Sequence, residues 1–146
     1  MRTSPLKFLT CVLLFLAGVG PVCRAQVQLV GDWGGTESIY GQNIHVLWHV
    51  TKASDGRITS AWDNVDQGVY GMKAKSITLN GDDLTIMVDD IVLVNGQNTR
   101  VVALYRGKVN KGFNEVTGTI KQTQPEEQPA TELTFKRELT LYDDEP

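Results

Sequence analysis

Short stretches in which apolar and polar residues alternate, separated by tight-turn dipeptides, constrain this chain more than any other feature. The turn pairs Asp55-Gly56, Asn80-Gly81 and Asn95-Gly96 tolerate the positive φ angles of two-residue hairpins, and Lys111-Gly112 is a looser version of the same signal. A hydrophobic period of two between such pairs is typical of half-buried strands, and no segment shows the period of an amphipathic helix. The pattern predicts antiparallel strands that follow one another in sequence order.

Eight segments of this kind are recognisable. They span residues 32–39, 43–52, 57–63, 73–79, 83–92, 99–109, 115–122 and 131–141. Eight short strands joined in order by tight turns favour a closed sheet, because closure removes the exposed edges. The predicted fold class is therefore all-β, an eight-stranded antiparallel up-and-down barrel.

The alternation also assigns an inward face to several of these strands. The predicted inward residues are Leu84, Ile86, Val88, Val101, Ala103, Tyr105, Gly107, Val109, Val116, Gly118, Ile120, Gln122, Leu133 and Phe135. Gly107 and Gly118 either let the barrel bend or leave room inside it.

The N-terminal residues resemble a secretory signal. Arg2 and Lys7 precede an apolar run, residues 8–19, that is too short to span a bilayer comfortably. Cys23 and Ala25 are the small residues that a signal peptidase reads, so we expect cleavage after Ala25. The prediction is a signal peptide at 1–25, a single domain at 26–146, and a secreted or periplasmic protein without membrane insertion after cleavage.

Removal of the signal changes the composition. Arg2, Lys7 and Arg24 are three of the 14 basic residues, so 11 remain against 17 acidic residues, a net charge of about −6. This sign argues against nucleic acid and anionic membrane surfaces as partners. Cys11 and Cys23 also leave with the signal, so the mature chain has no thiol and must be stabilised by packing.

A tryptophan among glycines opens the first predicted strand. Gly31, Asp32 and Trp33 form a Gly-x-Trp motif that resembles the signature of the calycin superfamily, which includes lipocalins, fatty-acid-binding proteins and avidins. The resemblance implies a lipocalin- or avidin-like barrel in which Trp33 closes one end. It also implies a basic side chain on the indole, and Lys136 and Arg137 are placed for this role.

A closer resemblance extends from about Gly31 to Arg137, through "GDWGGT", "HVTKASDGRIT", "DNVDQGVYGM", "YRGKV", "VTGTIKQ" and "LTFKR". It is similar to a lipocalin-like domain of bacterial exported proteins, often found beside serine hydrolases or α/β-hydrolases and of poorly defined function. The matched residues are Trp33, His49, Asp55, Gly56, Asp66, Gln67, Gly68, Tyr105, Gly107, Gly118, Thr119 and Gln122. Ile120 replaces the tryptophan of the family pattern, and the proline usual in the central loop is absent.

Metal and catalytic signals are sparse. His45 and His49 are two steps apart on one face of a strand, too far apart to share an ion, and the opposite face is more apolar, so both are expected to point outward. The sequence contains no nucleophile motif, phosphate loop or metal cluster, so no cofactor, metal or catalytic residue is assigned. In "DNVDQGVYG", residues 63–71, Asp66 and Gln67 shape a turn or present polar groups at the barrel mouth.

Two polar residues are predicted to face the barrel interior. Tyr105 and Gln122 have to be hydrogen-bonded, either by nearby backbone or by a bound molecule. The interior is either an open cavity or filled by its own side chains. If a ligand enters, Trp48, Tyr105 and Gln122 are predicted to line the cavity, with Asp66 and Gln67 at its rim.

Three functions follow from these residues. The first is a non-catalytic binding module for a small apolar or amphiphilic molecule. The second is an interaction module for a co-exported hydrolase. The third is a cofactor-free cyclase or isomerase that acts through Asp66 with Tyr70 or Tyr105.

Overall fold

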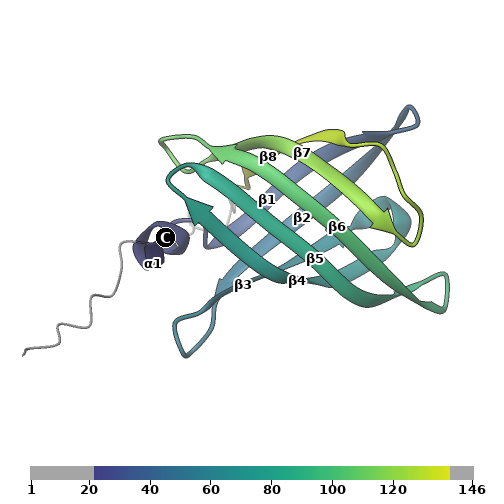
Figure 1. Cartoon of the computed structure of the whole chain (residues 1–146), viewed down its shortest axis with the longest axis horizontal. Helices are drawn as coiled ribbons and strands as arrows, with labels where there is room; N and C mark the ends of the chain where they lie inside the picture. The colour runs from purple at the N-terminus through teal and green to yellow at the C-terminus, as the bar shows by residue number, and fades with distance from the viewer. Residues whose placement is uncertain (1–21, 139–146) are drawn as a thin grey trace, which may run out of the picture.

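The computed structural model describes residues 22–138 and shows a closed, eight-stranded antiparallel barrel in which each strand pairs with its neighbours in sequence (Figure 1). The strands are β1 (Gly31–Ile39), β2 (Gln42–Lys52), β3 (Ile58–Asn64), β4 (Val69–Asn80), β5 (Asp83–Val94), β6 (Gln97–Val109), β7 (Glu115–Gln124) and β8 (Thr131–Arg137). β8 pairs with β1, which closes the barrel. The predicted fold class is confirmed.

The turn dipeptides lie where the sequence places them. Asp55-Gly56 connects β2 to β3, Asn80-Gly81 connects β4 to β5, and Asn95-Gly96 connects β5 to β6. In the last pair both residues have positive φ, 49° for Asn95 and 79° for Gly96. Positive φ at both turn residues gives a hairpin turn whose twist matches the right-handed twist of the flanking strands.

The main difference from the predicted strands is in the segment 63–71. β4 begins at Val69 rather than at residue 73, because the expected long loop is compressed into a single 3-10 turn, η1 (Val65–Gln67). The Asn64 side chain accepts a hydrogen bond from the Gln67 amide at 3.3 Å. Gly68 then takes a left-handed conformation with φ of 67°, which returns the chain to the sheet at once.

Smaller differences lie at the two ends of the chain. A short helix that was not predicted, α1 (Val22–Val27), precedes β1 and spans the expected cleavage site after Ala25. β8 ends at Arg137 rather than at residue 141. Residues 1–21 of the predicted signal and residues 139–141 of the predicted last strand lie outside the described residues.

A cluster of five aromatic side chains fills the end of the barrel that faces α1. Three tryptophans face one another across neighbouring strands, because Trp33 pairs with Trp48 and Trp48 pairs with Trp62. Phe135 and Tyr105 complete the cluster, with ring centroids 5.2 to 6.4 Å apart. All five are at most 1% exposed, so this half of the barrel is solid.

Two glycines make room for the Tyr105 ring. Gly107 and Gly118 pair across β6 and β7. A Cβ on Gly107 would lie 2.8 Å from the Tyr105 hydroxyl oxygen, and a Cβ on Gly118 would lie 2.8 Å from its Cζ. The small inward residues therefore accommodate an aromatic ring rather than leave a void.

Trp33 and Arg137 close this end. The Trp33 indole donates to the Leu29 carbonyl at 2.9 Å, and the Arg137 guanidinium lies 4.2 Å from the centre of the Trp33 ring. Arg137 also donates to three backbone carbonyls: Gln28 at 2.6 Å, Val30 at 2.8 Å and Phe113 at 3.0 Å. It thereby ties the segment before β1 and the β6–β7 hairpin to the end of β8. Gly31 lies beside this group with its φ at 136°.

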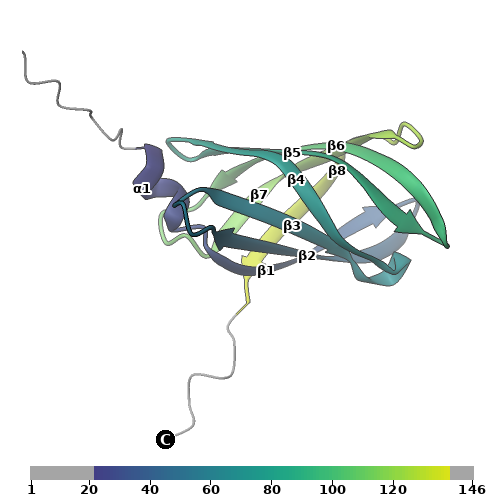
Figure 2. The same cartoon turned by 90° about the horizontal axis from the view of Figure 1, so that it is seen from below.

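The two ends of the barrel differ (Figures 1 and 2). Helix α1 and the hairpins β2–β3, β4–β5 and β6–β7 lie at the closed end, on the left in Figure 1. The β1–β2 and β5–β6 hairpins, η1 and the β7–β8 loop lie at the other end, on the right in Figure 2. Within residues 22–138, no helix has the length and apolar character needed to cross a membrane.

The contacts of Arg137 predict a large stability effect. We expect Arg137→Gln to lower the free energy of unfolding by about 3 kcal/mol, because three carbonyls lose a charged donor and the indole loses its cation. Urea unfolding followed by tryptophan fluorescence measures this. The neighbouring exposed Lys136 provides the control, since Lys136→Gln is expected to change stability by less than about 0.5 kcal/mol. Equal effects of the two variants would contradict the role given to Arg137.

Candidate functional site

A cavity of about 200 Å³ opens at the end of the barrel opposite α1. It is lined by Glu37, Ile39, Asn64, Gln67, Val69, Met72, Val94, Thr99, Val101, Ile120, Gln122, Pro125 and Gln128. We call it the mouth cavity. Its volume is below the roughly 300 to 1,000 Å³ usual for sites that take drug-sized molecules. It therefore suits a small ligand.

The cavity forms because the inward residues are aromatic near the closed end and aliphatic or polar near the open end. On β6, Tyr105 lies in the aromatic cluster, whereas Val101 and Thr99 line the cavity nearer the open end. On β1, Trp33 fills the closed end and Glu37 and Ile39 line the cavity. The interior is thus filled in one half and open in the other, so the two expectations of a filled core and an open cavity each apply to one half of the barrel.

Glu37 is the most unusual residue of this lining. Its side chain faces inward from β1 and it is only 8% exposed, among the lowest values for a charged residue here. The Thr131 hydroxyl, at the start of β8, donates a hydrogen bond to Oε1. Burial raises the pKa of the Glu37 carboxyl, and the bond from Thr131 partly opposes this effect.

Sequence reasoning missed Glu37, although a signal was present. Trp33 and Glu37 are four residues apart in one predicted strand, and period-two alternation places both on the same face. A carboxylate in phase with a barrel-closing tryptophan is expected to face inward. Thr131 carries no such signal, because its contact with Glu37 exists only once β8 pairs with β1.

Four carboxamide side chains add polar groups to the lining. Gln122 donates to the Glu126 carbonyl at 3.4 Å, and the Gln67 side-chain oxygen accepts from Asn64 at 3.0 Å. Gln128 and Asn64 are the other two. Of the five residues predicted to hold a ligand, Gln67 and Gln122 are the two that the structure places in this lining.

The other three predicted residues lie elsewhere. Trp48 and Tyr105 belong to the aromatic cluster, and the Tyr105 hydroxyl donates to the Leu133 carbonyl at 2.9 Å. Its hydrogen-bonding need is thus met by backbone, and burial raises the pKa of its phenol. Asp66 is exposed and its carboxylate accepts from the His45 backbone amide at 2.6 Å. The isomerase alternative requires Asp66 to act with Tyr70 or with Tyr105. The structure does not bring Asp66 and Tyr105 together, because Asp66 is exposed and Tyr105 is buried. Tyr70 is 62% exposed and so lies on the surface.

Both histidines point outward from β2, as expected from the apolar opposite face. The His45 ring lies 2.8 Å from Asp66, and the His49 ring is held between Asp32 at 2.7 Å and Asp63 at 3.0 Å. The bond to Asp32 is the main reason that the pKa of His49 is raised, with Asp63 adding to it and partial burial opposing it. Within residues 22–138 no group of three or more His, Cys, Asp or Glu is arranged to hold a metal ion.

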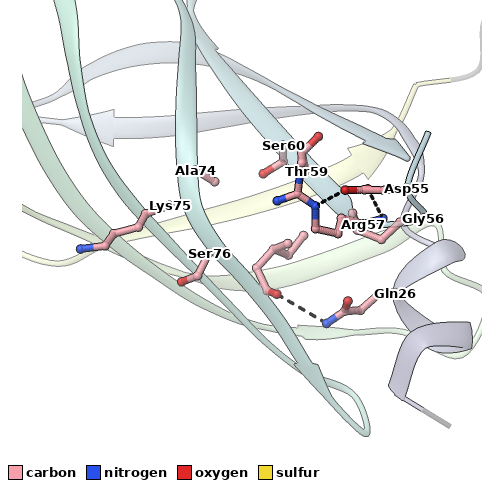
Figure 3. A pocket seen from close by; sticks show the side chains of 11 residues that line it. Gln26, Asp55, Gly56, Arg57, Thr59, Ser60, Ala74, Lys75 and Ser76 are labelled. Atoms are coloured by element: carbon pink, nitrogen blue, oxygen red, sulfur yellow. Dashed lines mark hydrogen bonds and ion pairs between the residues drawn. The ribbon is translucent and has the colours of Figure 1, made fainter. Parts of the chain in front are cut away.

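A second, larger hollow lies on the outer wall (Figure 3). On β3, the ladder with β4 includes only residues from Ala61 to Asn64. Toward the start of β3 the two strands are not paired, and a groove of about 560 Å³ lies between them. Gln26 of α1 reaches into this groove and its side-chain amide lies 3.5 Å from the Ile77 carbonyl. Five of its eleven lining residues are exposed, among them Asp55 and Arg57, whose ion pair measures 2.6 Å. The mouth cavity is smaller, but only two of its thirteen lining residues, Gln67 and Pro125, are exposed, which favours it as a ligand site.

Comparison with protein-family models and with curated proteins finds no match to this chain. What the structure itself establishes is the architecture, a closed eight-stranded antiparallel barrel.

The two carboxylates beside His49 predict a pH-dependent contribution to stability. Because folding raises the pKa of His49, this contribution is complete below about pH 6.5 and is lost as the pH rises through the folded-state pKa. We expect the loss of unfolding free energy in His49→Gln to be larger near about pH 5.5 than near about pH 8.5. Urea unfolding at both pH values measures it. A loss of the same size at both would contradict the ion pairs.

Proposed function

We propose that this protein is a non-catalytic binding module for a small amphiphilic molecule, which enters the mouth cavity. The observation that carries the proposal is the mixed apolar and polar lining of a cavity inside the barrel. Val69, Met72, Val101 and Ile120 supply apolar surface, and Glu37 supplies a buried polar group beside them. Sites for small molecules usually combine these two features.

The aromatic cluster supports the same proposal. Because the closed end is filled and tied by Arg137, a ligand has one route in, through the end that carries η1 and the β7–β8 loop. The apolar start of the chain and the small residues before Gln26 support a further part of the proposal, that the barrel works outside the cytoplasm, secreted or periplasmic.

Straight-chain alcohols from hexanol to decanol test the cavity. We expect one-to-one binding by isothermal titration calorimetry, with a negative heat-capacity change, because apolar surface is buried. Ile120→Trp restores the residue of the resembled family and adds bulk to the lining, so it is expected to weaken binding at least tenfold, about 1.4 kcal/mol.

Lys121→Trp is the matched control for this test. It adds the same side chain to the next residue of β7, which is exposed on the outer face. We expect this variant to bind like the wild type, with both variants folded by circular dichroism. Equal binding by all three proteins, or no binding by the wild type, would contradict a site in the mouth cavity.

Exposed apolar side chains beside the open end support a second candidate function, docking of a protein partner such as a co-exported hydrolase. Ile91 and Leu93 are successive outward residues of β5, and Tyr70 lies on the adjoining strand β4. Their exposed fractions are 66%, 62% and 62%. Contiguous exposed apolar patches mark sites of protein–protein contact, and these three side chains lie on two neighbouring strands.

Cross-linking in extract of the producing cells tests this second function. The wild type is expected to capture one stoichiometric partner, identified by mass spectrometry, and the triple variant Tyr70→Ser, Ile91→Ser and Leu93→Ser is expected to capture at least about tenfold less. The same yield from both proteins would exclude this patch as the docking surface.

A further inference from the structure

The Glu37 carboxylate is the single ionisable group in the lining of the mouth cavity, within the part of the chain that the structure describes. The side chains that face inward beside it are Ile44 of β2 and Leu133 of β8, both at most 5% exposed. Two charged residues of the neighbouring strands are exposed: Lys121 of β7, which pairs with Glu127 at 2.9 Å, and Glu132 of β8. Among residues 22–138, therefore, no Lys, Arg or His forms an ion pair with Glu37.

The hydrogen bonds of Glu37 are incomplete. Thr131 donates to Oε1, and among the described residues Oε2 has no hydrogen-bond partner. A carboxylate has about four acceptor positions across its two oxygens, so at least one side of the group is open toward the cavity. A ligand that displaces water from this carboxylate has to supply a donor in return, and a charged donor does so best.

We propose that the mouth cavity selects amphiphilic amines, with the protonated amine donating to Glu37 and the apolar body resting on Val101, Ile120 and Met72. This inference rests on the proposed function and adds the chemical class of the ligand. Fatty-acid-like carboxylates are the disfavoured class, since a second negative charge beside Glu37 has no cation in the lining to offset it.

The raised pKa of Glu37 sets the pH dependence of this selection. Burial favours the protonated carboxyl, which carries no charge for the amine to balance. The affinity for an amine is therefore expected to rise as the pH increases through the pKa of Glu37, which lies above its ordinary value. An uncharged alcohol is expected to show a much smaller change over the same range.

Three ligands of one chain length test the inference: octylamine, octanol and octanoate. With the wild type at about pH 7.5, we expect octylamine to bind at least about tenfold more tightly than octanol, and octanoate to bind more weakly than both. Glu37→Gln keeps the shape of the side chain and an acceptor for Thr131, so it is expected to remain folded and to bind octylamine and octanol equally. Glu132→Gln, which removes an exposed carboxylate one residue after Thr131, is expected to keep the amine preference.

The outcomes separate this inference from the proposed function. Equal binding of octylamine and octanol by the wild type, or an amine preference that survives in Glu37→Gln, would overturn the amine selection and leave the cavity as a binding site. Stronger binding of octanoate would overturn it in the same way. Failure of all three ligands to bind would remove the proposed function itself.

Discussion

The packing of three tryptophans side by side across β1, β2 and β3 is the constraint on which the rest of the structure depends. Trp33, Trp48 and Trp62 occupy paired positions on neighbouring strands, so their indoles fill one end of the barrel from one wall. Phe135 and Tyr105 meet them from the other wall. Each aromatic pair contributes about 0.5 to 1.5 kcal/mol beyond its buried area. This offsets the cost of leaving the Trp48 and Trp62 nitrogens without a partner in the described residues, about 1 to 3 kcal/mol each.

Filling one end so completely determines where a ligand is able to bind. The aromatic rings and the Arg137 contacts exclude the closed end, and the inward residues nearer the open end line the cavity of about 200 Å³. Glu37 lies between the aromatic cluster and the open end of the barrel. A buried carboxylate without a cation is costly in a filled core, but in a cavity it is reached by solvent or by a ligand. The same residue that weakens the fold as a core position is thus suited to a binding role.

Much of this arrangement was predictable from the residues. Period-two alternation and the Asx-Gly pairs specified the strand order, and the inward positions of β6, β7 and β8 followed from the same period. The compressed turn before β4 was not predictable, because it depends on the Asn64 side chain bonding to Gln67 and on Gly68 taking a left-handed conformation. Tyr105 was correctly placed inside, but its partner is the Leu133 carbonyl, 28 residues away in sequence, and alternation contains no information about that distance.

The sequence by itself determined the barrel, since local periodicity and turn chemistry are properties of neighbouring residues. It also determined that Trp33 and Glu37 share a face, and that Gln122 points inward. Only the tertiary structure decided which inward residues pack together and which line a cavity. The contact of Thr131 with Glu37 spans 94 residues and exists because β8 closes on β1. Closure is a long-range event, so the residues that it brings together, including those of the mouth cavity, are set by the whole barrel rather than by any one strand.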